Sequence, residues 1–395
     1  MQHITIPIMK FNSFFFVVVY TLLLSCHPGS VEQLQSEINS VAERWVPDKS
    51  VGICNITLVN GNILKGETLF PGAKTEVLQL LKSKNITVID SVIVLPDTLH
   101  LEKNWGVVSL SVANLRTKPA HSAELASQAI MGTPVRILKE SDEWILVQTP
   151  DNYIAWTNKS SVKQMTRSEM NNWRSADRMI FTSSYGTISG DSKLKTVLSD
   201  LVAGAIVIKK SENQNITEVC LPDGKTGYVS NLNWLNLKEW KDTISVIPAK
   251  LIANGKQFMG FPYLWGGTSS KAMDCSGFVK TIYFLNGVIL ERDASQQFKH
   301  GKEIDITAGW DNLQKGDLLF FGSKEPFRVT HVGMYIGNSE VMHSSNSMGR
   351  VWINSLDPKS DNYSNRLSSS LLGAKRMIGT PSEQGYLPVK RHSWY

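Results

Sequence analysis

The sequence predicts an α+β fold in which two small antiparallel β-barrels precede a mixed domain. Residues 115–158 and 189–234 repeat one order of features: a small-residue turn, a β-branched run, a polar turn, a second alternating run, and an Asp-Asn or Asp-Gly step before an aromatic residue. Short alternating runs joined by Gly, Asn and Asp turns are typical of small barrels. From residue 249 a helix, a Gly-rich loop, a second helix and then strands follow, which indicates a separate domain of about 140 residues.

The composition is that of a globular protein with two or three domains. The 395-residue chain is 42% hydrophobic and 19% charged. Its formal net charge of +6 is mild, and no run of five or six Lys or Arg residues occurs. A basic run of that kind is typical of proteins that bind the phosphate backbone. We therefore expect no nucleic-acid partner.

Residues 1–25 are interpreted as an export signal. Lys10 precedes the run FFFVVVYTLLL at 14–24, which is about half the roughly 20 residues that a membrane-spanning helix needs. The ending LLSC at 23–26 resembles the lipobox of bacterial lipoproteins, which implies a lipid anchor on Cys26. A plain secretory signal is the alternative. Either interpretation predicts an exported protein of the periplasm or cell envelope.

Three cysteines follow the signal: Cys54, Cys220 and Cys275. An odd number in a compartment that permits disulfides leaves at least one thiol free. A Cys54–Cys220 bridge and two separate thiols both fit the sequence, and Cys275 is the one left over in either case. The chain has no HExxH or CxxC pair, and one Cys with two His residues on different elements lacks a fourth zinc ligand. We expect no metal and no cofactor.

Cys275 lies where the Gly-rich loop at 260–274 meets an apolar helix. Apolar residues follow with a helical period, and Asn286-Gly287 is a suitable end for the helix. The free N–H groups of a first helical turn favour an anion, which predicts a lowered thiol pKa and a nucleophile. A packing cysteine is the alternative, because most cysteines at such positions only fill space. A base nearby would decide between the two.

His331 is the candidate base, on a strand predicted within RVTHVGMYIGNSEVMHSS at 328–345. Alternate residues of a strand face opposite sides. His331 therefore faces away from the more apolar row, and Gly333 on the same side leaves space beside it.

The position of His343 depends on the turn after this strand. A three-residue loop at 337–339 pairs Ile336 with Glu340 and puts His343 on the face of His331, whereas a two-residue loop puts it on the opposite face. The longer loop supplies a thiol, a base and a polar group that orients the base, which together make an activated nucleophile.

These stretches resemble the successive motifs of the NlpC family of papain-like cell-wall peptidases. The matching residues are DCSGF at 274–278, GDLLFF at 316–321, HVGMYIG at 331–337, and His343. The resemblance implies a papain-like catalytic domain that hydrolyses the D-glutamyl–diamino acid bond of murein stem peptides.

The same resemblance implies roles for individual residues. Cys275 is expected to be the nucleophile, His331 the general base, and His343 the group that orients it. Tyr263 matches the family tyrosine near the oxyanion, and the backbone N–H of Cys275 would donate to the same oxyanion. Asp274 and Ser276 are expected to line the substrate groove.

The two repeats resemble the bacterial SH3-like modules that accompany cell-wall enzymes. Residues 47–108 combine strand-like runs with a predicted helix at 73–82 and are interpreted as an elaboration packed on the first barrel. The expected division of the chain is a signal at 1–25, a first SH3-like domain with this elaboration at 26–165, a second at 166–245, and the peptidase domain at 246–385.

Together, these domains resemble the γ-D-glutamyl-L-diamino-acid endopeptidases, also called dipeptidyl-peptidases VI. That group takes stem peptides with a free N-terminal L-alanine and releases L-Ala-D-Glu. A desolvated ammonium needs a carboxylate, and Glu124, Tyr153 and Asp293 match the family residues of the amine pocket. Asp293 also fits a helix N-cap. Where the family has a serine after this acid the chain has Ala294, and Ser295 comes one residue later as the candidate contact.

Three other functions stay open at this point. A wall-cleaving hydrolase would accept intact peptidoglycan. A wall-binding lipoprotein without catalysis would need a broken catalytic set. An acyltransferase on the same fold would release no free dipeptide.

Overall fold

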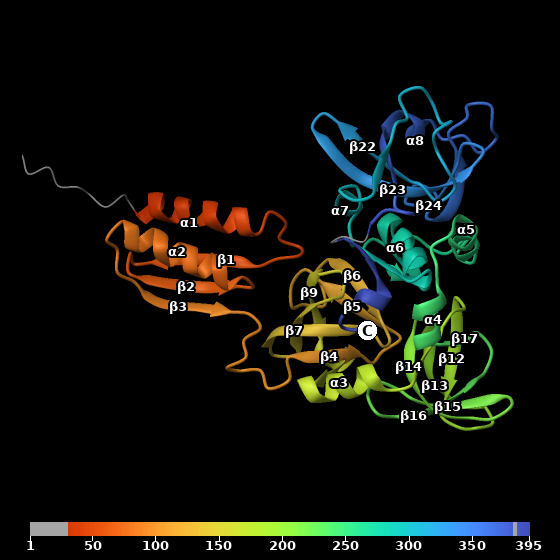
Figure 1. Ribbon diagram of the computed structural model, residues 1–395, viewed down its shortest axis with the longest axis horizontal. Helices are drawn as coiled ribbons and strands as arrows, with labels where there is room; N and C mark the ends of the chain where they lie inside the picture. Colours follow the sequence, from red (N-terminus) through yellow and green to blue (C-terminus); the bar gives the residue numbers. More distant parts are fainter. Residues whose placement is uncertain (1–30, 382–384) are drawn as a thin grey trace, which may run out of the picture.

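The computed structural model describes residues 31–381 and 385–395. The predicted signal and Cys26 lie outside the described residues. No helix within these ranges has the length and apolar character needed to cross a bilayer. Along the chain come a small α/β unit, two barrels and a mixed domain, and the C-terminus returns to the first barrel (Figure 1).

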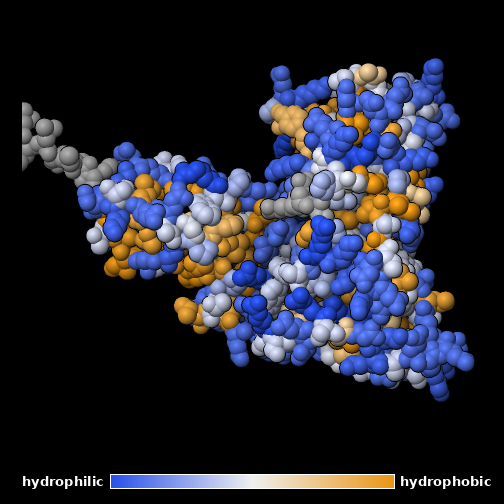
Figure 2. Space-filling model, viewed as in Figure 1, coloured by the Kyte–Doolittle hydropathy of each residue, from blue (hydrophilic) through white to orange (hydrophobic). Residues whose placement is uncertain are grey.

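The N-terminal unit is a three-stranded sheet with two helices. Strand β1 pairs antiparallel with β2, and the α2 crossover brings β3 parallel to β2. Pro71 occupies the first turn of α2, where its missing N–H costs nothing. Exposed Ile89 and Ile93 belong to β3, and Figure 2 shows hydrophobic residues along that side of the unit. The elements are α1 (Val31–Trp45), β1 (Cys54–Val59), β2 (Ile63–Thr68), α2 (Pro71–Ser83) and β3 (Ile89–Val94).

The N-terminal unit has its own core and packs apolar side chains against the first barrel. Its helices and sheet enclose buried side chains such as Ile38, Leu64 and Leu81. At the contact with the first barrel, Ile53 and Leu95 belong to the same buried cluster as two barrel leucines, Leu138 and Leu146.

The two barrels share one topology, which confirms the repeat. The first has strand order β10-β4-β7-β8-β9-β5-β6, and the second, in matching positions, β17-β11-β14-β15-β16-β12-β13. The repeated turn also matches: Asn152 and Gly224 both have positive φ, of 65° and 92°, a conformation that Asn and Gly adopt most readily.

The strands of the first barrel are β4 (Trp105–Val108), β5 (Val112–Arg116), β6 (Leu125–Ile130), β7 (Pro134–Ser141), β8 (Trp144–Gln148), β9 (Ile154–Asn158) and β10 (Val162–Met165). Those of the second are β11 (Arg178–Phe181), β12 (Tyr185–Ser189), β13 (Val197–Val202), β14 (Ile206–Glu212), β15 (Ile216–Cys220), β16 (Thr226–Ser230) and β17 (Trp234–Asn236). Helix α3 (Arg167–Ser175) connects the barrels and begins with a capping box between Thr166 and Glu169.

In the C-terminal domain, helix α6 packs on a six-stranded sheet of order β21-β26-β22-β23-β24-β25. The helices are α4 (Leu237–Thr243), α5 (Pro248–Lys256), α6 (Cys275–Leu285), α7 (Ala294–Gln297) and α8 (Asn365–Ser370). The sheet contains β21 (Lys302–Ile304), β22 (Leu318–Lys324), β23 (Phe327–Gly337), β24 (Glu340–Ser345), β25 (Arg350–Ser355) and β26 (Leu371–Arg376). Two small pairs complete it: β18 (Thr268–Ser269) with β19 (Ala272–Met273), and β20 (Val288–Leu290) with β27 (Tyr386–Pro388).

The first barrel is fixed against the loop and helix that carry Cys275. Thr268 donates its N–H to Gln128 Oε1 at 3.1 Å and its hydroxyl to the Gln128 carbonyl at 2.8 Å. The Lys280 ammonium on α6 forms an ion pair with buried Asp151 of the barrel. Breaking a buried pair leaves an uncompensated charge, so these contacts hold the barrel close to the Cys275 end of α6.

Candidate active site

Cys275 is the first residue of α6, as the sequence predicts. Asp274 is the N-cap residue, and its Oδ1 accepts the Gly277 N–H at 2.7 Å. The preceding loop packs closely on this turn, because a Cβ on Gly277 would lie 2.1 Å from the Gly267 carbonyl oxygen. The Cys275 side chain is therefore held in place by the cap below it and the loop beside it.

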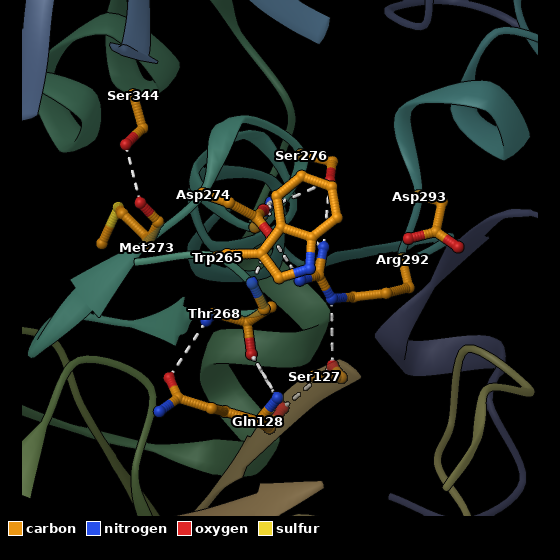
Figure 3. A network of polar contacts seen from close by, with 12 residues as sticks. Ser127, Gln128, Trp265, Thr268, Met273, Asp274, Ser276, Arg292, Asp293 and Ser344 are labelled. Atoms are coloured by element: carbon orange, nitrogen blue, oxygen red, sulfur yellow. Dashed lines mark hydrogen bonds and ion pairs between the residues drawn. The ribbon is translucent and has the colours of Figure 1, made fainter. Parts of the chain in front are cut away.

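A buried arginine ties this helix start to the first barrel. Arg292 donates Nη1 to Asp274 Oδ1 at 3.1 Å and Nη2 to Asp274 Oδ2 at 2.5 Å (Figure 3). It also donates Nη1 to Ser276 Oγ at 2.9 Å and Nε to Ser127 Oγ of the barrel at 3.1 Å. Two predicted groove residues, Asp274 and Ser276, thus belong to an internal polar network. The sequence analysis missed Arg292, since a partner 165 positions away along the chain leaves no local pattern.

The two histidines form a hydrogen-bonded chain across three strands. His331 Nε2 lies 2.7 Å from His343 Nδ1, and His343 Nε2 lies 3.0 Å from Asn354 Oδ1. Asn354 Nδ2 donates to the Asn362 carbonyl at 3.1 Å, so the amide oxygen faces His343 and must accept. His343 therefore carries its proton on Nε2 and accepts on Nδ1, and His331 donates from Nε2. This arrangement leaves the Nδ1 lone pair of His331 free to act as a base.

The turn before His343 differs from the predicted one, yet His343 reaches the predicted face. The loop holds two residues, Asn338 and Ser339, with φ of 52° and 60°, and Gly337 rather than Ile336 pairs with Glu340. The expected Ile336–Glu340 pairing is wrong. The register shifts between Tyr335 and Gly337, so a bulge at Ile336 adds the residue that the shorter loop removes.

The predicted site residues within the described ranges line two adjoining cavities that share Trp265, Arg328 and Thr330. The thiol-side cavity has a volume of about 710 Å³ and is lined by Glu124, Tyr153, Asp274, Cys275, Ser276, Asp293 and Ser295 among others. The histidine-side cavity has a volume of about 580 Å³ and includes Tyr263, His331 and His343.

The thiol-side cavity is lined by acidic and aromatic residues from the first barrel and the C-terminal domain. Asp293 begins α7 as its N-cap residue, and Figure 3 shows its carboxylate apart from the Arg292 network. No ion pair joins Asp293 to a cationic side chain in residues 31–381 and 385–395. Burial raises its pKa, and burial together with the Asp293 charge raises that of the Tyr153 hydroxyl. Exposed Glu124 accepts from Trp265 Nε1 at 2.7 Å at the rim, a tryptophan that the sequence analysis did not single out.

The N-terminal unit contacts helix α7, which Asp293 begins. Gln296 accepts the Asp293 N–H on Oε1 at 2.9 Å. Its Nε2 donates to Asp48 Oδ2 and to Ser50 Oγ, both at 2.8 Å. The Ser50 carbonyl in turn accepts the Ile154 N–H of the first barrel at 2.7 Å. Three parts of the chain therefore meet around Asp293, and the sequence analysis missed the contribution of Asp48 and Ser50.

The Cys275 thiol is protonated at neutral pH. Burial, followed by the charge of Asp274, raises its pKa to about 12. The expected lowering of this pKa by the helix start is therefore wrong, because desolvation outweighs it. Burial also lowers the pKa of His331 well below 6.5 and that of His343 to about 4, so both imidazoles are neutral. A neutral thiol becomes a nucleophile only when a base takes its proton as the sulfur attacks.

The other two cysteines in the part of the chain that the structure describes are free thiols. Cys54 is buried in the N-terminal unit, and Cys220 is half-buried in the second barrel. In the described part of the chain, no group of three or more His, Cys, Asp and Glu side chains is placed to hold a metal ion.

Comparison with known proteins finds family matches for the C-terminal domain and for the first barrel. Residues 260–368 match the NlpC/P60 family, and residues 115–162 match the bacterial dipeptidyl-peptidase SH3 domain. A dipeptidyl-peptidase 6 from Lysinibacillus sphaericus is 30% identical over 277 residues, which cover 67% of this chain and 97% of that protein. A γ-D-glutamyl-L-lysine dipeptidyl-peptidase from Bacillus cereus is 29% identical over 56% of this chain and 67% of its own length.

A solved structure shows the same fold. The crystal structure of an NlpC/P60 family protein from Bacillus cereus superposes with a TM-score of 0.59 at 24% identity, covering 69% of this chain and 99% of that one. This likeness and the two family matches confirm the predicted α+β fold class, with a papain-like domain beside an SH3-like domain. Because the match to the Lysinibacillus protein covers nearly all of that relative, the chain belongs to the NlpC/P60 family of cysteine peptidases.

Proposed function

We propose that this protein is a γ-D-glutamyl-L-diamino-acid endopeptidase that removes L-Ala-D-Glu from murein stem peptides with a free N-terminal alanine. The observation that carries the proposal is the Asp293 carboxylate, which lines the cavity that contains Cys275 and forms no ion pair with the residues that the structure describes. The names of the relatives, dipeptidyl-peptidase 6 and γ-D-glutamyl-L-lysine dipeptidyl-peptidase, support the same substrate class.

The proposed chemistry uses Cys275 as nucleophile and His331 as base. The sulfur attacks the γ-carbonyl carbon of D-Glu while Nδ1 of His331 takes the thiol proton. The same proton then passes to the amine of the diamino acid as the C–N bond breaks, which leaves a thioester on Cys275. Water, deprotonated by His331, hydrolyses the thioester and releases the dipeptide. His343 and Asn354 keep the imidazole in the required tautomer.

Two groups are placed to stabilise the oxyanion. The Cys275 N–H belongs to the first turn of α6 and therefore has no acceptor within the helix. The Tyr263 hydroxyl has its pKa raised by burial and by nearby Cys275, so it stays protonated and can donate. Each such donor contributes about 3 kcal/mol in enzymes of this kind.

The free amine is the feature that the thiol-side cavity selects. An ammonium that loses water needs a carboxylate, and Asp293 offers one, with Tyr153 and Glu124 lining the same cavity. Acylation removes the positive charge and adds bulk. In intact peptidoglycan the alanine amine is amide-linked to the sugar, so this cavity does not suit the intact wall.

N-acetylation of the substrate tests this proposal. We expect L-Ala-γ-D-Glu-diaminopimelate to be cleaved and its N-acetyl form to lose roughly 100-fold or more in kcat/KM, because a buried carboxylate is left without its partner. Both rates are measured by chromatography of the released diamino acid. Equal cleavage of the two peptides would contradict the amine pocket.

The pH profile gives a second test. Because burial lowers the pKa of both imidazoles, the base is still neutral at about pH 5.5, where an ordinary histidine is mostly protonated. We therefore expect no acid limb from the imidazoles at that pH. kcat/KM should fall only in stronger acid, as the imidazoles or Asp293, whose pKa burial raises, take up a proton. On the alkaline side it should fall near pH 8, as the α-amine of the substrate loses its proton. An acid limb centred at pH 6.5 or above would contradict the buried, neutral pair.

We also propose that the protein is exported and anchored to the membrane by a lipid on Cys26. An extracellular or envelope location fits the cell-wall hydrolases of the family. The anchor is supported by the lipobox-like ending at 23–26 alone. Metabolic labelling with a fatty-acid probe should mark the natural protein and spare its Cys26→Ala variant.

A further inference from the structure

The histidine-side cavity carries positive charge and no negative charge. Arg328 of β23 lines this cavity and the thiol-side cavity, and Arg366 of α8 lines this cavity alone; both residues are exposed. No Asp or Glu lines this cavity, and the other lining residues are chiefly serines, asparagines and the two histidines. Neither guanidinium forms an ion pair within the part of the chain that the structure describes.

The thiol-side cavity carries charges of both signs. Its carboxylates are those of Glu124, Asp274 and Asp293, its cations are those of Arg292, Lys299 and the shared Arg328, and Asp274 pairs with Arg292. Carboxylates therefore line only the thiol-side cavity of the groove, whereas the arginines of β23 and α8 give the histidine-side cavity positive charge alone. A bound peptide with an ammonium at one end and a carboxylate at the other would match this polarity.

The chemistry decides which part of the substrate occupies the basic end. His331 must protonate the leaving amine, so the diamino acid residue lies on the His331 side of Cys275. The positive charge of Arg366 acts on His331 and helps to lower its pKa. Arg366 and His331 line the same cavity, so the residue whose amine leaves would lie in the cavity that Arg366 lines.

We propose that Arg328 and Arg366 bind a carboxylate of the leaving diamino acid, so that the enzyme recognises its substrate at both ends. This inference rests on the proposed peptidase function and assigns the substrate class of its second subsite. A guanidinium binds a carboxylate through paired N–H donors, which a neutral carboxamide cannot replace.

Two carboxylates can fill this subsite. In a tripeptide, the α-carboxylate of the third residue is free, whether that residue is lysine or diaminopimelate. Diaminopimelate has a second carboxylate at the end of its side chain, whereas lysine has only an ammonium there. Both sources predict that amidation of one carboxylate of the leaving residue lowers the rate, but they differ in which carboxylate matters.

The test compares acids with amides. The substrates are L-Ala-γ-D-Glu-L-Lys, its C-terminal carboxamide, and L-Ala-γ-D-Glu-meso-diaminopimelate amidated at either carboxylate. With the natural enzyme we expect one amidation to lower kcat/KM roughly 10- to 100-fold, since it removes a charge-assisted contact. A loss on α-amidation assigns the α-carboxylate, and a loss on side-chain amidation assigns the distal one.

Arginine variants distinguish a loss of carboxylate recognition from a general loss of activity. In the Arg328→Gln and Arg366→Gln variants, cleavage of the free acid should slow while cleavage of the amide changes little, so that the preference for the free acid disappears. Arg167→Gln, at an exposed position on α3, changes the net charge equally and should keep the preference. Equal cleavage of acids and amides by the natural enzyme would overturn this proposal alone. Absence of cleavage of every free-amine peptide would overturn the proposed function and this subsite with it.

Discussion

Replacing Cys275 with alanine is expected to lower kcat/KM for the free tripeptide by about 10⁴-fold or more. The variant keeps the groove and the oxyanion donors but loses the atom that forms the thioester, and loss of a nucleophile in comparable enzymes has effects of this size. The rate is measured under pseudo-first-order conditions with the natural enzyme in parallel. Circular dichroism checks that the small change at the start of α6 leaves the fold intact.

Cys220→Ala is the matched control for this substitution. Cys220 is a free, half-buried thiol in the second barrel and lines neither active-site cavity. Its variant should cleave at the natural rate. If Cys275→Ala kept more than a few per cent of the activity, the cysteine-peptidase mechanism would be wrong for this chain.

Asp293→Asn is expected to have the second largest effect, roughly 10²- to 10³-fold in kcat/KM for the free peptide. Asparagine is as good an N-cap as aspartate, so α7 keeps its start, but the ammonium loses its buried partner. Cleavage of the N-acetyl peptide should change little. The ratio of the two rates, measured for natural enzyme and variant, reports on the amine pocket alone.

Asp142→Asn provides the control for charge. Asp142 is exposed in the turn between β7 and β8 and has a φ of 49°, which asparagine also accepts. This variant should retain the full preference for the free amine. A preference that survives Asp293→Asn, or a loss that is equal for both peptides, would contradict the role assigned to Asp293.

What the sequence predicted well is local. The helix from Cys275 and the alternation from His331 to Tyr335 are properties of a few consecutive residues, and the structure places them as expected. The repeated barrels were predictable for the same reason, since each turn is specified by its own residues, such as Asn152 and Gly224.

What the sequence did not predict depends on distant partners. Gln296 meets Asp48 across 248 positions of the chain, and Arg292 meets Ser127 across 165. Asn354 completes the histidine chain only because β25 pairs with β24. The predicted length of the loop before His343 was also wrong, because the bulge at Ile336 offsets the shorter turn.

The prediction for the pKa of Cys275 was wrong for a different reason. Its position at a helix start was read correctly, but the degree of burial depends on how the first barrel and the loop close over the helix, and burial raises the thiol pKa to about 12. This result changes the proposed mechanism from a resting thiolate to a thiol that His331 deprotonates. The nucleophile is the same in both mechanisms.

Mass spectrometry of the products formed from free tripeptide and from intact sacculi tests the central claim most directly. The account predicts that L-Ala-D-Glu is released from the free tripeptide, with the diamino acid as the other product, and that sacculi yield no new peptide ends. Release of fragments from intact sacculi at a rate comparable to tripeptide cleavage, or a cut at any bond other than D-glutamyl–diamino acid, would contradict it.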